Sequence, residues 1–312
     1  MGGLFALMLV GLIGLAAATG WEETIAQVKQ LAVWQILALL ALSLVNYLFR
    51  GLRWHLFSTR LGLPTGLLQN TRHYIGGFAM SVTPGRVGEL VRMRWIHRET
   101  GWNFERTAPL ALMDRASDLV ATALILAIAL VLSATGISGA VPVVLIALII
   151  AFITTRPALL STIAALAYRL VGRAPRLFVR IRRAAGSLAK FSNPWVMGAA
   201  SALGLIGWLA EGFAFYILLV WMGAQIDPWT AIAIFIFATM VGGLIGSPGG
   251  LGGAEGAMIG LLLLEGVPVE ISVPATLIIR ITTLWFAIAL GLLVFPVAEK
   301  LSNRGIHGLE NR

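Results

Sequence analysis

The chain consists largely of apolar stretches that are long enough to cross a lipid bilayer. Of its 312 residues, 58% are hydrophobic and only 12% are charged, and the mean hydropathy is +0.89. A helix of about 20 apolar residues spans the hydrocarbon core and pairs its own backbone groups there. A transmembrane β-barrel would show period-2 alternation, which this sequence lacks. The sequence therefore predicts an all-α polytopic integral membrane protein, with about six spanning helices near residues 4–19, 31–48, 107–132, 141–153, 196–221 and 271–297.

The first apolar stretch has a second interpretation as a signal peptide, because it is short and ends in Ala16-Ala17-Ala18. A signal peptide also needs basic residues before its apolar run, and none precede this one. We therefore expect that the first stretch is a retained membrane helix.

One short pattern occurs twice within the apolar sequence: a hydroxyl residue, Pro, Gly, a variable residue, an aliphatic residue, Gly and then Glu. The copies are Thr83-Pro84-Gly85-Arg86-Val87-Gly88-Glu89 and, with two residues added before the acid, Ser247-Pro248-Gly249-Gly250-Leu251-Gly252-Gly253-Ala254-Glu255. Pro removes a backbone donor and Gly weakens a helix, so each copy should break a helix. Broken backbone at membrane depth is tolerated only where protein buries it or water reaches it. We therefore expect two re-entrant hairpins, at residues 73–96 and 231–264, broken at Pro84, Gly85, Pro248 and Gly249.

The positions of the basic residues predict the orientation. With a cytoplasmic N-terminus, most of the 23 lysines and arginines fall in cytoplasmic segments. These include residues 50–72, the return of the first hairpin at Arg92, Arg94, Arg98 and Arg106, and a basic connection at 155–193. Both termini should then be cytoplasmic. Three spans separate the hairpins, so the hairpins should enter from opposite faces. This is an inverted-topology repeat, typical of secondary transporters, formed by residues 31–154 and 194–297 of a single transmembrane domain spanning 1–312.

Several charged residues lie inside the predicted membrane segments: Arg86, Glu89, Asp114, Arg115, Asp118, Glu211, Glu255 and Arg280. Each charge costs roughly 2.5 to 3.5 kcal/mol at the bilayer centre, so these side chains must pair or face water. Guanidinium groups pair bidentately with phosphate oxygens. We therefore predict a substrate site for an anionic group, held by Arg86, Arg115 and Arg280. Its other members would be Asp114 and two acids, Glu89 and Glu255, that orient the arginines or carry protons.

The alternative is that these charges form buried ion pairs that fix helix packing and bind no ligand. This alternative carries most weight for Asp118 and for Glu211, which has no counterpart in the other half of the repeat. The net charge of +9 follows from the topology, so we expect no nucleic-acid partner. The four histidines show no metal-ligand spacing and the chain has no Cys, so we expect no catalytic residues, no metal and no cofactor.

In their order along the chain, several motifs resemble the lysylphosphatidylglycerol synthetase transmembrane family, which is also described as flippase-like. They are Arg50-Gly51-Leu52-Arg53-Trp54, the motif at 83–89, Asp114-Arg115, the motif at 247–252, Glu255 and Arg280. The resemblance implies a multi-pass protein of the bacterial inner membrane that handles a lipid. Bifunctional family members resemble flippases for aminoacylated phospholipid, and others accompany lipid-linked glycan or hopanoid pathways. Bifunctional members also carry a soluble aminoacyl-transferase domain, which this sequence lacks, so we do not expect it to aminoacylate lipid.

Three functions are consistent with these features. The first is a lipid translocase that moves an anionic or phosphate-containing membrane lipid between leaflets, with its headgroup on the arginines. The second is a membrane enzyme of glycosyl or phosphoryl transfer to a lipid carrier, and the third is a secondary transporter of a small anion. The resemblance favours the translocase.

Overall fold

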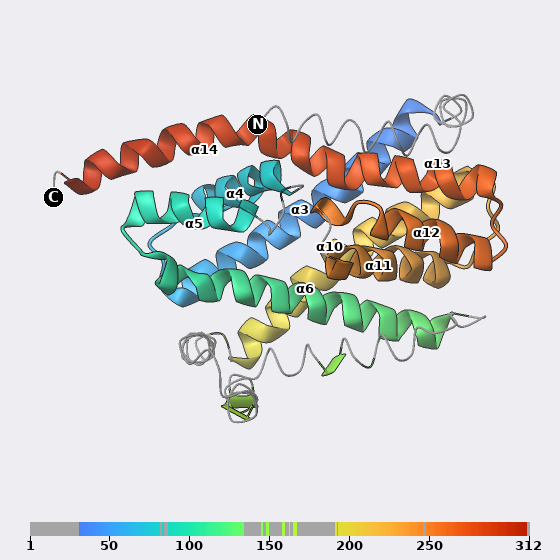
Figure 1. Cartoon of the computed structure of the whole chain (residues 1–312), viewed down its shortest axis with the longest axis horizontal. Helices are drawn as coiled ribbons and strands as arrows, with labels where there is room; N and C mark the ends of the chain where they lie inside the picture. Colours follow the sequence, from blue (N-terminus) through green and yellow to red (C-terminus); the bar gives the residue numbers. More distant parts are fainter. Residues whose placement is uncertain are drawn as a thin grey trace.

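The computed structural model describes residues 31–81, 83, 87–133, 191, 193–245 and 248–310, with isolated positions between 145 and 166 (Figure 1). The predicted helix at 4–19 lies outside these residues. The predicted helix at 141–153 and the basic connection at 155–193 lie largely outside them. Within the described residues every regular element is helical, which confirms the all-α prediction.

Four helical runs among the described residues are long and apolar enough to cross a membrane. They are α3 (Val33–Leu61), α6 (Phe104–Leu132), α10 (Pro194–Trp221) and the run Val269–Gly305. Two begin at asparagines that cap the helix, since the side chains of Asn103 and Asn193 accept hydrogen bonds from backbone N–H groups of the first turn. The last three runs begin within two or three residues of the predicted starts.

α3 extends well beyond its predicted end at residue 48, and this corrects the expected loop at 50–72. Arg50 and Arg53 lie inside the helix, and Arg53 is fully buried. The helix continues past these charges because carboxylates of α6 neutralise them in the protein interior. These arginines therefore do not count as cytoplasmic loop charges, and neither does Arg92, which is buried on α5 (Val87–Thr100). The orientation of the chain stays a prediction.

Both motif segments separate two helices. In the first half, α4 (Leu67–Gly76) and the short 3-10 helix η1 (Gly77–Met80) precede α5. In the second half, α11 (Pro228–Ile245) and the short η4 (Pro248–Gly250) precede α12 (Gly253–Leu264).

The second break depends on glycine. Gly249, Gly250 and Gly252 all have φ between 65° and 82°, a left-handed conformation that residues with a Cβ rarely adopt. The helix is therefore interrupted at Gly249. Pro84 and Gly85 lie outside the described residues. That each helix pair enters and leaves on one face of the membrane, and that the halves are inverted, remain predictions.

One long helical run along the molecule contacts both broken helix pairs (Figure 1). It consists of α13 (Val269–Arg280), a π-helical turn η5 (Ile281–Trp285) and α14 (Phe286–Glu310). α13 packs against α12, whereas α14 packs against α4, η1 and α5. At Gly291 the contact is so close that an added Cβ would lie 2.3 Å from the backbone nitrogen of Ala79. The π-helical turn therefore sits between the parts of this run that contact each pair.

Candidate functional site

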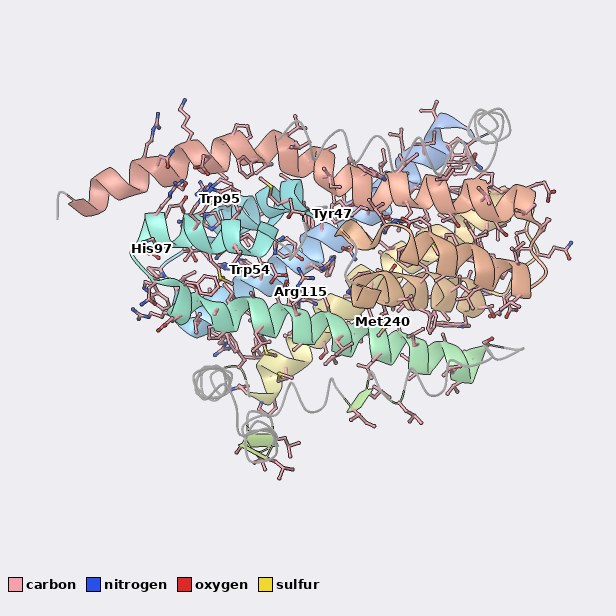
Figure 2. All side chains as sticks on the ribbon, viewed as in Figure 1. Tyr47, Trp54, Trp95, His97, Arg115 and Met240 are labelled. Atoms are coloured by element: carbon pink, nitrogen blue, oxygen red, sulfur yellow. The ribbon has the colours of Figure 1, made fainter. Side chains whose placement is uncertain are left out.

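A cavity of about 800 Å³ lies between the two breaks. This volume is within the range typical of small-molecule sites. Its walls come mainly from α3, α5, α6, α10 and α11, together with η1, η4 and η5, and α4, α12, α13 and α14 contribute one residue each. Figure 2 labels three of the lining residues, Tyr47, Arg115 and Met240. The charged lining residues are Arg50, Glu89, Arg92, Arg115, Asp118, Glu211 and Arg280.

Each half of the chain contributes the same ion pair to this region. In the first half, the Nε of Arg115 donates a hydrogen bond to Oε1 of Glu89. In the second half, the Nε of Arg280 donates to Oε1 of Glu255 over 2.6 Å. In each case the glutamate lies in the first turn of the helix after the break, and the arginine lies on the next helix. In both halves a glutamate therefore fixes the orientation of an arginine.

The second pair also holds the backbone of its break. Oε2 of Glu255 accepts a hydrogen bond from the backbone N–H of Gly252 over 2.7 Å. Nη2 of Arg280 donates to the backbone carbonyl of Gly249 over 2.7 Å. The glutamate thus satisfies a free N–H at the start of α12, as a capping residue does. Glu255 itself does not line the cavity but supports Arg280, which does.

Asp114 lies behind the cavity wall rather than in it. Nη2 of Arg53 is 2.7 Å from Oδ1 of Asp114 and 2.7 Å from Oδ1 of Asp118. Asp118 also accepts hydrogen bonds from Arg50 over 2.7 Å and from the indole N–H of Trp208 over 3.1 Å. This arrangement matches the alternative of buried ion pairs that fix the packing of α3, α6 and α10.

Arg92 lines the cavity, although its position in the sequence predicted that it would lie at the cytoplasmic return of the first hairpin. Its guanidinium carbon lies 4.2 Å from the ring centre of Tyr74, 5.4 Å from that of Trp54 and 5.6 Å from that of Phe78. Gly77 makes room for it, because a Cβ there would lie 2.2 Å from Nε of Arg92. One signal could have found this residue, since Glu89 and Arg92 are three residues apart and share a helical face.

Three further residues from the predicted site and its motifs are Arg86, Pro248 and Glu211. Arg86 lies outside the described residues, and at Pro248 only the backbone is described. Glu211, the least supported candidate from sequence, is buried and lines the cavity. Within the described part of the chain, no group of three His, Asp or Glu side chains could hold a metal ion.

Long apolar helices around a buried, charged cavity define a multi-pass α-helical membrane protein. The sequence matches the family profile of the lysylphosphatidylglycerol synthase TM region over residues 1–291. The chain belongs to this family, which confirms the resemblance seen in its motifs.

Two proteins of one organism are similar to the chain. A UPF0104 membrane protein of Methanothermobacter thermautotrophicus is 28% identical over 305 residues, which cover 92% of this chain and 90% of the relative. A second protein of that name from the same organism is 31% identical over 102 residues, which cover 31% of this chain and 30% of the relative.

Proposed function

We propose that the chain is a lipid translocase, which moves a membrane lipid with a phosphate-containing headgroup between leaflets. The observation that carries the proposal is a cavity that both breaks line and that buried charged side chains surround. A polar headgroup would occupy this cavity while its tails stay in the bilayer. Membership of a family linked to lipid handling supports a lipid cargo over a soluble anion.

The two matched ion pairs give this proposal a physical basis for alternating access. The side chains of Arg115 and Glu89 are 36% and 20% exposed, whereas those of Arg280 and Glu255 are 9% and 3% exposed. The first pair is thus accessible in a state in which the second is buried. We infer that translocation exchanges these exposures, and that the π-helical turn η5 accommodates the change.

The proposal is tested by reconstituting the protein in liposomes with headgroup-labelled phosphatidylglycerol and a quencher that reaches only the outer leaflet. Wild type should equilibrate the label between leaflets, and Arg280→Gln should slow this at least about tenfold, because it removes a buried positive charge from the cavity wall together with its charge-assisted hydrogen bonds to Glu255 and to the second break. Arg94→Gln is the matched control, since Arg94 pairs with Glu299 outside the cavity. Equal rates for all three proteins would contradict the proposed site.

The lipid crosses the membrane without chemical change in this proposal. The membrane is the cell membrane, and both termini lie on its cytoplasmic side. Mass spectrometry of lipids incubated with the purified protein should therefore return them unaltered. A new lipid product would instead support the membrane-enzyme alternative.

The absence of Cys allows a direct test of the re-entrant hairpins. Single cysteines at Leu68 and Glu105 flank the first helix pair, and cysteines at Gln225 and Glu270 flank the second. A membrane-impermeant thiol reagent should label both members of each set from one side, with the two sets on opposite sides. Labelling of the two members of a set from opposite sides would show that the pair spans the bilayer.

A further inference from the structure

Among the described residues that line the cavity, one charged side chain of each sign forms no ion pair. Among its described lining residues, the charged side chains that already form ion pairs are Arg50, Glu89, Arg115, Asp118 and Arg280. Arg92 and Glu211 form none. Both are more than nine-tenths buried, with exposures of 4% and 6%. An unpaired buried charge is unfavourable, so each is a place where a ligand group of the opposite sign would be stabilised.

Arg92 has most of its hydrogen-bonding capacity free. A guanidinium has five N–H donors. In Arg92, Nη2 donates a hydrogen bond to the backbone carbonyl of Tyr74 over 2.9 Å. Its Nε is buried without a partner. The rings of Trp54, Tyr74 and Phe78 compensate the charge partly through cation–π attraction, but they accept no ordinary hydrogen bond. An anionic oxygen in the cavity would complete this environment.

Glu211 presents the complementary case. Its carboxylate can accept several hydrogen bonds, and the described residues supply none. Arg50 and Arg280 line the same cavity, but they are held by Asp118 and Glu255. An ammonium group in the cavity could donate to this carboxylate without displacing an existing pair.

The charges around the cavity also balance within the described residues. Five arginines face five carboxylates there, namely Arg50, Arg53, Arg92, Arg115 and Arg280 with Glu89, Asp114, Asp118, Glu211 and Glu255. Among these ten side chains, a ligand without net charge keeps this balance. Arg115 and Arg280, which the sequence suggested for the anion, already have carboxylate partners.

We infer that the cavity selects a zwitterionic headgroup, with its phosphate on Arg92 and its ammonium on Glu211. The inference rests on the proposed function and assigns its substrate class. It gives two residues distinct roles: Arg92 binds any phosphate-bearing headgroup, and Glu211 discriminates in favour of those that also carry an amine.

Binding to the purified full-length protein in detergent tests this inference without requiring transport. The probes are dihexanoyl-phosphatidylethanolamine, which is zwitterionic, dihexanoyl-phosphatidylglycerol, which is anionic, and soluble phosphoethanolamine. Wild type should bind the ethanolamine lipid more tightly than the glycerol lipid. Arg92→Gln should weaken the binding of both lipids about tenfold or more, as expected for loss of a charge-assisted contact.

Glu211→Gln should weaken only the ethanolamine lipid, by about tenfold, because its ammonium loses an ionised partner. Arg94→Gln is the matched control, since Arg94 pairs with Glu299 outside the cavity, and it should leave both affinities unchanged. Arg92→Lys and Glu211→Asp keep the charges and should retain the preference for the ethanolamine lipid over the glycerol lipid. These two variants replace the neutral ones if a neutral variant fails to fold.

The outcomes separate the two proposals. Unchanged ethanolamine-lipid affinity in Glu211→Gln, or tighter wild-type binding of the glycerol lipid, would overturn the zwitterion inference and leave translocation standing. Phosphoethanolamine that binds as tightly as its lipid would support the charge pair but contradict a lipid cargo. If wild type shows the expected binding pattern but does not translocate lipid in liposomes, the translocase proposal is wrong and the zwitterion inference stands.

Discussion

The two Glu–Arg pairs have the same chemistry but lie in different surroundings. Glu89 and Arg115 are partly exposed to the cavity, whereas Glu255 and Arg280 are almost completely buried. The second pair also binds the backbone at Gly249 and Gly252. The first pair instead extends toward Asp118, which lies 3.7 Å from Arg115. The pair at the first break is therefore mainly accessible from the cavity, whereas the same pair at the second break mainly holds the backbone in place.

The helices that flank the breaks differ in the same way. α11 and α12 meet through small residues, since a Cβ on Gly242 would lie 2.8 Å from Cβ of Ala254. α4 and α5 are joined by polar contacts, because Glu99 pairs with Arg72 and lies 3.0 Å from Nε2 of His73. The first helix pair is thus held partly by charges that pH can change, and the second by packing.

The largest expected effect comes from breaking the buried pair. Arg280→Leu leaves Glu255 charged and unpaired in the interior, which should cost about 3–5 kcal/mol of stability. Arg115→Leu removes a more exposed interaction and should cost about 1 kcal/mol or less. Thermal unfolding in detergent would measure both. The double variant Glu255→Leu with Arg280→Leu should recover part of the loss, and equal losses for the two single variants would contradict the comparison.

The next effect concerns the backbone of the second break. Gly249 has φ 65°, so Gly249→Ala should destabilise the protein by about 1–2 kcal/mol through strain in the left-handed conformation. Gly256→Ala is the control, because Gly256 lies within α12 and an added Cβ there meets no atom within 4 Å. That control should be neutral or stabilising, since Ala favours a helix. A neutral Gly249→Ala would show that the break does not depend on this glycine.

The smallest effect is the pH dependence of the first helix pair. Burial acts to raise the pKa of Glu99, but hydrogen bonds from His73 and Gln69 and the charge of Arg72 outweigh it and lower the pKa below its usual value. Ionised Glu99 therefore stabilises the folded protein above the pKa of Glu in the unfolded chain, which is about 4.3. This stabilisation is lost as the pH falls through the lower pKa that Glu99 has in the folded protein.

Glu99→Gln should consequently lower the melting temperature at pH 7 and change it little once the acid is protonated in both states. Melting curves of wild type and variant between pH 7 and the lowest tolerated pH would show the two converging. A melting difference that is independent of pH would mean that Glu99 contributes only through its shape.

Much of the fold could be predicted because its signals are local. The apolar stretches near 107–132, 196–221 and 271–297 mark helices that the structure contains, since a bilayer core admits little other backbone structure. The break at Gly249 was predictable because a Pro-Gly sequence disfavours a helix wherever it occurs. α3 was predicted too short, because the partners of Arg50 and Arg53 are 61 to 68 residues away in the chain.

The site was predictable in part for the same reason. The repeated motif identified Glu89, Glu255 and the arginines that pair with them, because the spacing recurs in both halves. Arg92 was counted as a loop charge, since no sequence pattern shows that Trp54 and Tyr74 surround it. Asp114 was named as a substrate contact, yet Arg53 of α3 holds it behind the cavity wall.

By itself, the sequence determined that this chain is a helical membrane protein, where its helices break and which acid and arginine follow each break. These properties depend on hydrophobicity and backbone conformation, which act between near neighbours. Only the tertiary structure decided which charges are neutralised, which pair is exposed, and that Arg92 and Glu211 face the cavity without an ion-pair partner among the described residues. Electrostatic pairing and burial depend on distances in space, and helices far apart in the chain set those distances.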